Sequence, residues 1–319
     1  MLHQVCPPSG EAFEPSRILQ ITPGFLDLAI RTVREEGFEI VSLDDAHARL
    51  QAGSGGGDGV RPFVCFTLDD GYRDNLVHAL PVFQAHDVPF TVYIPDRYAD
   101  GDGDLWWLVL EDVVRCTDTL SVVMDGVECE FATGTLDEKH EAHHRIYWWL
   151  RGLDEDTARN VVRELADHHG VDGKAIAGAL LMSWDEIRLL NDDPLTTIGA
   201  HTSGHYAMAK LSDERMHREV AINLDRLETE LGERPAHFSY PYGCEASAGP
   251  REFAHLASLG LKTAVTTRKG MVFPDHGAHL TALPRFSLNG DYQDSRYLKV
   301  LLSGAPFLLW NRGRRLNVA

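Results

Sequence analysis

Two adjacent carboxylates follow an apolar run of the chain near residue 70. The run and the residues after it read Pro62-Phe63-Val64-Cys65-Phe66-Thr67-Leu68-Asp69-Asp70-Gly71. Side chains of neighbouring residues diverge at the end of a strand, so one carboxylate can hold a metal ion while the other accepts protons. Taken alone, an Asp-Gly turn followed by a helix cap explains this pattern better than a catalytic site does.

Two histidines four residues apart follow another apolar run. His201 and His205 come directly after the segment 195–200. If the chain between them turns helically, both imidazoles can face one metal ion. The alternative is a pair of polar loop histidines, because a chain with 16 histidines contains such spacings by chance. His143 and His144 belong to that background, and their polar, helix-like surroundings predict a solvated face.

A proline-glycine turn is expected after a third strand-like run. The residues there are Phe238-Ser239-Tyr240-Pro241-Tyr242-Gly243. Such a turn can present a backbone N–H group and an aromatic wall. By itself, this motif is also explained by an ordinary turn.

Strand-like and helix-like runs alternate along the chain, which predicts an α/β fold. Strands are expected at 38–41, 62–68, 90–94, 195–200, 236–240, 261–266 and 283–288. Helices are expected at 23–37, 42–50, 74–86, 212–231 and 250–259. This gives about seven strand–helix units, which is enough to close a barrel. All three motifs fall at the carboxyl ends of predicted strands, where parallel α/β folds gather their catalytic groups.

Residues 98–181 break this rhythm. They predict a helix at 102–116, a hairpin around Asp125-Gly126, and two polar helices at 137–150 and 155–169. We interpret them as an insertion between a first part of the barrel, residues 1–97, and a second part with a C-terminal helix, residues 182–319. The tryptophan pairs of the insertion are expected in a small core, with stacking on sugar rings as the alternative: Trp106-Trp107 and Trp148-Trp149. The glycine-rich stretch 53–59 predicts a flexible connector.

Charge and cysteine content exclude several classes of protein. The 319 residues include 30 Lys and Arg and 48 Asp and Glu, so the formal net charge is -18. This argues against a nucleic-acid partner and against broad contact with an anionic membrane. The five cysteines are scattered and form no CxxC pair, so neither a disulfide scaffold nor a thiolate zinc site is indicated.

Targeting signals are not evident in the sequence. We find no secretory signal at the N-terminus and no apolar stretch of about 18 residues, so we expect a cytoplasmic protein without a transmembrane segment. The apolar segment 297–310 is followed by Arg312, Arg314 and Arg315. Such a helix can lie on a membrane, but packing on the barrel is favoured because Gly304 and Pro306 interrupt it.

The order Asp-Asp-Gly, HxxxH, Pro-Tyr-Gly resembles the polysaccharide deacetylase family, also known as carbohydrate esterase family 4 or the NodB homology domain. The motifs of that family are T-F-D-D-G, H-[ST]-x-x-H and R-x-P-Y. The resemblance covers about residues 62–94 and 183–288. It implies a distorted (β/α)7-type barrel of the NodB kind.

The resemblance also implies a site and a reaction. Asp69 would be the general base, while Asp70, His201 and His205 would bind a divalent metal, with Zn²⁺ as the expected ion. Tyr242, in the turn that begins at Pro241, would hold the oxyanion with its backbone N–H. The implied reaction is a metal-dependent removal of N-acetyl groups from amino sugars such as N-acetylglucosamine. The implied substrate is an N-acetylated polysaccharide or glycoconjugate.

The chain departs from the family pattern at two functions. Ser239 stands where the family has the arginine that orients the base; Arg285 could substitute, or it could be a surface charge. The family's late Leu-x-His motif, which supplies the general acid, is missing. His3 resembles the histidine of an N-terminal Tyr-His segment that serves as the acid in deacetylases acting on poly-N-acetylglucosamine. His279, in a loop, is the alternative.

Two other functions remain open from the sequence. One is a metal-dependent amide or imide hydrolase that acts on a small non-sugar substrate. The other is a glycan-binding protein that has lost catalysis, which the missing arginine and displaced acid allow. Retention of Asp69 with the three metal ligands that the resemblance implies argues against the latter, because binding alone would not need all four groups.

Overall fold

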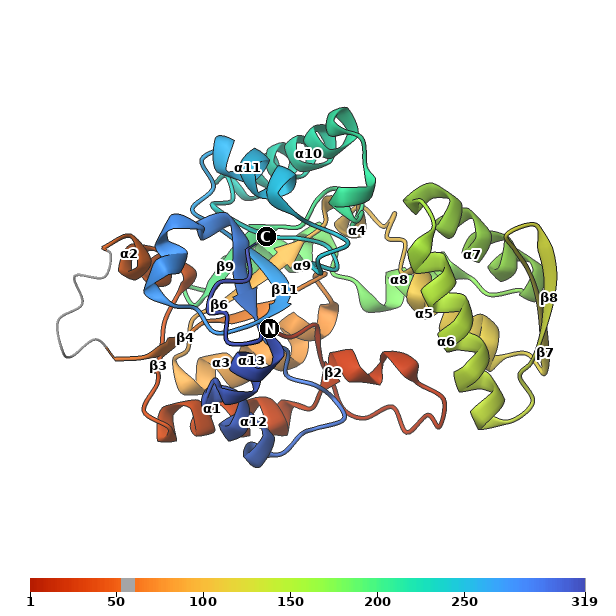
Figure 1. Cartoon of the computed structure of the whole chain (residues 1–319), viewed down its shortest axis with the longest axis horizontal. Coiled ribbons are helices and arrows are strands. Elements are labelled where there is room, and N and C mark those ends of the chain that lie inside the picture. The colour runs from red at the N-terminus through yellow and green to blue at the C-terminus, as the bar shows by residue number, and fades with distance from the viewer. Residues whose placement is uncertain (53–60, 319) are drawn as a thin grey trace.

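Six parallel strands form the central sheet of this computed structural model, which describes residues 1–52 and 61–318 (Figure 1). In chain order the strands are β5 (Phe66–Leu68), β6 (Phe90–Ile94), β9 (Thr196–Ala200), β10 (His237–Ser239), β11 (Thr263–Lys269) and β12 (Leu283–Arg285). Their order across the sheet is β12-β11-β10-β9-β6-β5. Most of their side chains are buried, as expected for a parallel sheet covered on both faces.

The first residues of the chain join the two edges of this curled sheet. The backbone N–H of Leu2 donates to the Thr67 carbonyl at 2.8 Å, and its carbonyl accepts from the N–H of Asp69 at 3.0 Å. On the other side, the N–H of Leu288, just after β12, donates to the Met1 carbonyl at 3.0 Å. The expected distorted NodB-like barrel is therefore confirmed, with residues 1 and 2 between β5 and the segment that follows β12.

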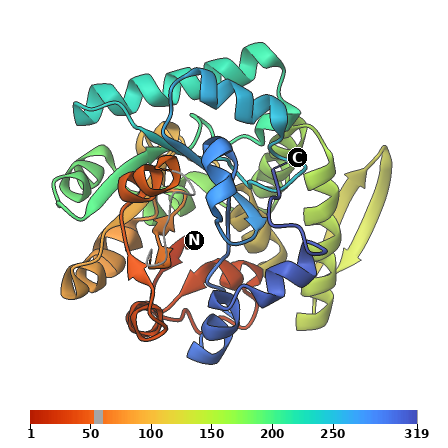
Figure 2. The same ribbon diagram turned by 60° about the vertical axis from the view of Figure 1, so that its left-hand side comes forward.

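Helices surround the strands (Figure 2). They are α1 (Pro23–Glu35), α2 (Leu43–Gln51), α3 (Leu80–His86), α4 (Asp96–Ala99), α9 (Trp184–Asn191), α10 (Asp213–Leu231), α11 (Pro250–Ser258), α12 (Ser295–Leu302) and α13 (Ala305–Trp310). Hydroxyl side chains cap several of them, as at Thr22 before α1 and Ser212 before α10. Several of them pack directly on the strands, as α9 and α10 do on β9, whereas α12 packs on α1. The helices therefore hold the strand ends in fixed positions.

The predicted strand 62–68 is divided in the structure, which corrects the sequence-based prediction. Its first part, β4 (Phe63–Val64), pairs with β3 (Glu39–Ile40) in a separate small sheet, and only β5 joins the main sheet. A second small sheet pairs β1 (Gln4–Val5) with β2 (Gln20–Ile21). The glycine-rich stretch 53–59 lies outside the described residues.

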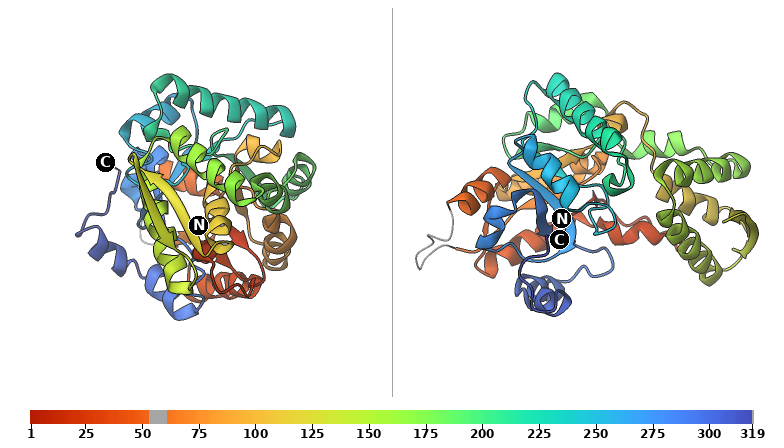
Figure 3. Two further views of the ribbon diagram at one scale, coloured as in Figure 1. Left: turned by 90° about the vertical axis from the view of Figure 1, so that its right-hand side faces the viewer. Right: turned by 45° about the horizontal axis from the view of Figure 1, so that its top comes forward.

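The segment 98–181 forms a lobe beside the barrel (Figures 1 and 3). Its elements are α5 (Trp106–Arg115), β7 (Thr119–Met124), β8 (Val127–Ala132), α6 (Leu136–Gly152), α7 (Glu155–His169) and α8 (Gly173–Leu180). The hairpin at Asp125-Gly126 is confirmed. The lobe has its own hydrophobic cluster, distinct from that of the barrel. As expected, this cluster includes Trp106 and Trp107. Trp148 is instead 59% exposed, so the prediction of a core position was wrong for this residue.

His143 also departs from the prediction of a solvated face. Its side chain is only 9% exposed and packs between the rings of Phe13 and Tyr147, whereas His144 is exposed. Burial lowers the pKa of His143 to about 4. The contact with Phe13 explains the error, because that residue comes from a distant part of the chain.

We expect His143 to make the protein sensitive to acid. In the unfolded chain this imidazole binds a proton near its ordinary pKa of about 6.5, while the folded protein keeps it neutral down to about pH 4, so stability falls as the pH drops through this window. The contribution lost between pH 7.5 and pH 5 is ~2 kcal/mol. Urea unfolding at both pH values should show a smaller loss for His143→Gln than for His144→Gln. Equal losses in the two variants would contradict this assignment.

Candidate metal centre and active site

Asp70, His201 and His205 meet at the carboxyl ends of the strands. The Oδ1 atom of Asp70 lies 3.3 Å from Nε2 of His201 and 3.2 Å from Nε2 of His205. One potential ligand atom from each residue lies within 4.8 Å of the others, and all three side chains are buried. The structure therefore brings together the three residues that the sequence proposed as metal ligands.

The hydrogen bonding of His201 indicates what this group of residues needs. Its Nδ1 atom is 2.6 Å from the Ser239 carbonyl, which only accepts, so Nδ1 carries the proton. In a neutral ring, Nε2 is then a bare lone pair that faces an oxygen of Asp70, which itself has no hydrogen-bond partner. Two buried acceptors this close require a cation between them or a proton. The donor set of two imidazoles and one carboxylate fits a divalent transition metal.

His205 is prepared for the same role. Burial lowers the pKa of His205 to about 4, so the ring is neutral near pH 7, which is the form that binds metals. The rings of Tyr98 and Trp107 lie against it, with centroids 5.8 and 5.3 Å away. These aromatic walls fix its orientation and exclude water from one side.

The loops around the metal centre have strained backbone conformations that the surrounding structure must stabilise. Asp70, Thr202, His205 and Tyr242 all have left-handed backbone conformations, with φ between 56° and 76°. Such values are uncommon for residues other than glycine and cluster at functional sites. Asn223 of α10 accepts from the backbone N–H of His201 at 2.8 Å. The loop that begins at His201 is thus tied to a helix of the barrel.

Asp69 is paired with Arg285 across the interior of the barrel. The guanidinium donates to both carboxylate oxygens, at 2.8 and 2.7 Å, and both side chains are buried. Although burial opposes ionisation, Arg285 lowers the pKa of Asp69 to about 2. The carboxylate is therefore ionised and held in a fixed orientation beside Asp70.

Arg285 contacts Ser239, the residue that stands where the family has its arginine. Its guanidinium also donates to Oγ of Ser239 at 2.9 Å and to Oγ1 of Thr67 at 3.0 Å. The sequence placed Arg285 near the start of a strand 283–288, but β12 ends at this residue. The side chain consequently lies at the carboxyl edge, and the surface-charge alternative is excluded.

His3 lies next to this group of residues. It follows Leu2, which pairs with the residues around Asp69, and its Nδ1 atom is buried without a hydrogen-bond partner. Burial lowers the pKa of His3, while the charges of the two aspartates oppose this shift. His279 lies before β12, at the opposite end of the strands from the site, so the structure does not bring it to the site.

Tyr242 connects the site to the insertion. No hydrogen bond from its backbone N–H is present within residues 1–52 and 61–318, so this donor is available at the turn after Pro241. The phenol oxygen accepts from Nε1 of Trp106 at 2.8 Å, and the guanidinium of Arg151 lies 3.6 Å from the ring centroid. The lobe thereby fixes the residue that carries the candidate oxyanion donor.

Arg159 is a positioning residue that sequence reasoning missed. It comes from α7 of the insertion, is buried, and donates to the His205 carbonyl at 2.9 Å. The same guanidinium lies over the ring of Tyr206, with its central carbon 4.1 Å from the ring centroid. One of its nitrogens lies 3.5 Å from a carboxylate oxygen of Asp104. Nothing in the spacing of the sequence connects position 159 with position 205.

We expect Arg159→Met to weaken metal binding by about tenfold or more, because residues that support a metal ligand typically contribute this much. The measurement is competition for Zn²⁺ with a chromophoric chelator. Arg163→Met is the matched control, because Arg163 is one turn further along α7, is exposed, and also lies near Asp104. Unchanged affinity in Arg159→Met, or an equal loss in both variants, would contradict a positioning role.

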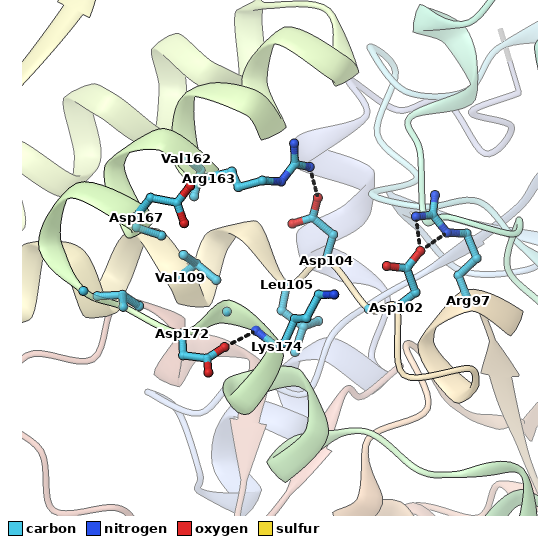
Figure 4. Close-up of a pocket in the computed structure, with 15 residues that line it drawn as sticks. Arg97, Asp102, Asp104, Leu105, Val109, Val162, Arg163, Asp167, Asp172 and Lys174 are labelled. Atoms are coloured by element: carbon cyan, nitrogen blue, oxygen red, sulfur yellow. Dashed lines mark hydrogen bonds and ion pairs between the residues drawn. The ribbon is translucent and has the colours of Figure 1, made fainter.

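A separate cavity of about 490 Å³ lies between residues 102–105 and the helices α7 and α8 (Figure 4). Its charged walls include the ion pairs Arg97–Asp102 and Arg163–Asp104. The described residues that line it do not include any member of the Asp-His-His group. The chemistry is therefore assigned to the metal centre rather than to this cavity.

The comparison with protein families agrees with the fold and this site. A curled parallel barrel with a buried Asp-His-His group defines a class of hydrolytic enzymes, and the profile of the polysaccharide deacetylase family matches residues 56–263. This match spans more than half of the chain, so the chain belongs to the polysaccharide deacetylase family. Members are hydrolases that act on the amide bonds of N-acetylated sugars.

Solved structures share the fold. The Streptococcus pyogenes deacetylase PplD in complex with acetate has a TM-score of 0.61 and 14% identity, and 94% of each chain is covered. For IcaB from Ammonifex degensii the TM-score is 0.56 and the identity 19%, with 94% of this chain and 93% of that chain covered. For a de-N-acetylase from Aggregatibacter actinomycetemcomitans the TM-score is 0.57 and the identity 13%, with 94% of this chain and 97% of that chain covered. No significant match was found among curated proteins. At these identities, the likeness establishes the fold alone.

Proposed function

We propose that this protein is a metal-dependent N-deacetylase that releases acetate from N-acetylated amino sugars of a polysaccharide or glycoconjugate. The observation that carries the proposal is the buried Asp70, His201 and His205 group beside an ionised Asp69. Family membership supports the substrate class. The acetate bound by PplD is what such a reaction releases, and this supports the reaction type.

The metal would be held by Asp70, His201 and His205. Three protein ligands leave coordination positions open, as catalytic zinc sites require, and the donor set favours Zn²⁺. A divalent ion bound there would acidify water and polarise the acetamide carbonyl. The Ser239 carbonyl orients His201, and Arg159 supports the loop of His205.

The residues around the metal centre can divide the remaining chemistry. Asp69 would accept the proton of the water that attacks the acetamide carbon. The N–H of Tyr242 would stabilise the negative charge that develops on the carbonyl oxygen. His3 would donate a proton to the sugar nitrogen as the C–N bond breaks, leaving acetate and a free amino sugar.

The geometry of Arg285 supports catalysis over a purely glycan-binding role. The missing family arginine was one of two reasons to consider lost catalysis, and the displaced general acid was the other. A bidentate guanidinium now orients Asp69 from β12 instead. A binding protein would have no need for this buried and costly pair.

The test combines metal content with acetate release from N-acetylglucosamine oligomers. We expect about one metal ion per chain, loss of acetate release on chelation, and recovery when Zn²⁺ is added. Metal binding without acetate release, but with hydrolysis of small cyclic amides, would favour the amide or imide hydrolase instead. Saccharide binding without hydrolysis of either substrate would overturn the catalytic proposal.

A further inference from the structure

The two last helices expose an apolar surface that the barrel does not cover. Leu298, Leu302 and Phe307 are buried, and α12 packs against α1. On the outer side, Leu309 is 83% exposed and Trp310 is 66% exposed. The packing favoured by the sequence therefore accounts for only one face of this helical segment.

Basic residues lie directly beside these exposed apolar side chains. Residues 305–318 include three exposed arginines and no acidic residue, although the chain as a whole carries a net charge of -18. We call Leu308, Leu309, Trp310, Arg312, Arg314 and Arg315 the C-terminal patch.

Contacts within the C-terminal patch and just after it fix it to the barrel. The side chain of Asn311 donates to the Lys269 carbonyl at 2.9 Å, and Val318 packs against the main core. The ammonium group of Lys269 lies 4.0 Å from the ring centroid of Trp310. Lys269 is the last residue of β11, so the patch adjoins the edge of the sheet that carries the active site.

We propose that the C-terminal patch docks this protein peripherally on an anionic lipid surface. Exposed Leu and Trp side chains enter the headgroup boundary, and adjacent arginines bind anionic headgroups, which together provide the two signals that stable surface binding requires. A soluble phosphate would engage the arginines alone and would leave the apolar side chains exposed. None of the described helices is long and apolar enough to cross a membrane, so the docking is interfacial.

The overall negative charge does not oppose this docking strongly. The Debye length is about 10 Å at 0.1 M ionic strength, so carboxylates on distant faces are screened from the lipid surface. Asp294, the N-cap residue of α12, forms an ion pair with Arg296. Lys299 of α12 forms an ion pair with Glu36. Within residues 305–318 the three arginines are the only charged side chains, so the charge of the patch itself is positive.

Vesicle sedimentation of the whole chain tests the role of charge. We expect binding to vesicles of phosphatidylcholine that contain phosphatidylglycerol, little binding to phosphatidylcholine alone, and weaker binding as salt rises. Each basic residue near such a surface strengthens binding about fivefold, so replacing three should weaken it by on the order of 100-fold. The test variant is Arg312→Gln with Arg314→Gln and Arg315→Gln. The control removes the same charge elsewhere: Arg31→Gln with Arg61→Gln and Arg218→Gln.

A second pair of variants tests the apolar part. Leu309→Ser with Trp310→Ser should also weaken vesicle binding, whereas Val123→Ser with Val127→Ser, on the exposed hairpin, should not. Acetate release from a soluble substrate should be unchanged in all four variants, which separates this test from that of the proposed function. Equal binding to both vesicle types, or equal effects of patch and control variants, would overturn the proposal. Self-association that is lost only in the patch variants, without vesicle binding, would assign the patch to a second copy of the chain.

Discussion

Asp69→Asn should lower kcat for acetate release by about 10²–10⁴-fold, the range contributed by a positioned general base. The substitution removes the proton acceptor but keeps an oxygen that can accept from Arg285. Because Asp69 is not one of the three metal ligands, metal content should stay near that of the unmodified protein. The measurements are steady-state acetate release and metal analysis of the same preparations.

His201→Ala is the matched comparison for Asp69→Asn. It removes a metal ligand, so both metal content and acetate release should fall. The two variants thus separate proton transfer from metal binding. Full activity in Asp69→Asn would place the base elsewhere, and loss of metal from this variant would assign Asp69 to the coordination sphere.

The resemblance implied the metal ligands, and the way parallel sheets are built explains why these residues meet. Asp70 comes shortly after β5, and His201 follows β9. These two strands are separated by β6, but the carboxyl ends of all parallel strands lie at one edge of the sheet. Once each motif is placed at the end of a parallel strand, its position near the other motifs follows from the sheet and needs no further knowledge of long-range contacts. This is why motifs that were weak individually became informative together.

The contacts of the insertion could not be predicted in the same way. Trp106, Arg151 and Arg159 reach the site from helices whose own periodicity only reports which side of each helix is buried. A buried arginine and a core residue give the same helical pattern until the packing partner is known. His143 was misplaced for the same reason, since its burial depends on Phe13.

The role of the first residues was also only partly predictable. The sequence identified His3 by resemblance, but a residue so near a chain end is expected to be frayed. The structure holds this segment through backbone hydrogen bonds from residue 2 to Thr67 and Asp69. These bonds depend on the gap between β5 and β12, which is a property of barrel closure rather than of local sequence.

Arg285→Met should remove both stability and activity. It leaves the buried Asp69 carboxylate without its bidentate partner, and breaking a buried ion pair in this way costs about 3–5 kcal/mol. Urea unfolding measures this loss. Arg285→Lys keeps a positive charge and should restore much of the stability, but it cannot reproduce the planar fork that orients the carboxylate.

The activity of Arg285→Lys therefore distinguishes a positioning role from a structural one. We expect kcat to fall by about tenfold or more with KM little changed, because the metal centre and the turn at Tyr242 remain intact while Asp69 loses its fixed orientation. A further variant, Arg285→Ser with Ser239→Arg, moves the guanidinium from β12 to β10, where the family carries it. Since Oγ of Ser239 lies 2.9 Å from the guanidinium, the exchanged arginine enters the same space and should recover part of kcat. Wild-type kcat in Arg285→Lys would show that the arginine only holds the barrel together.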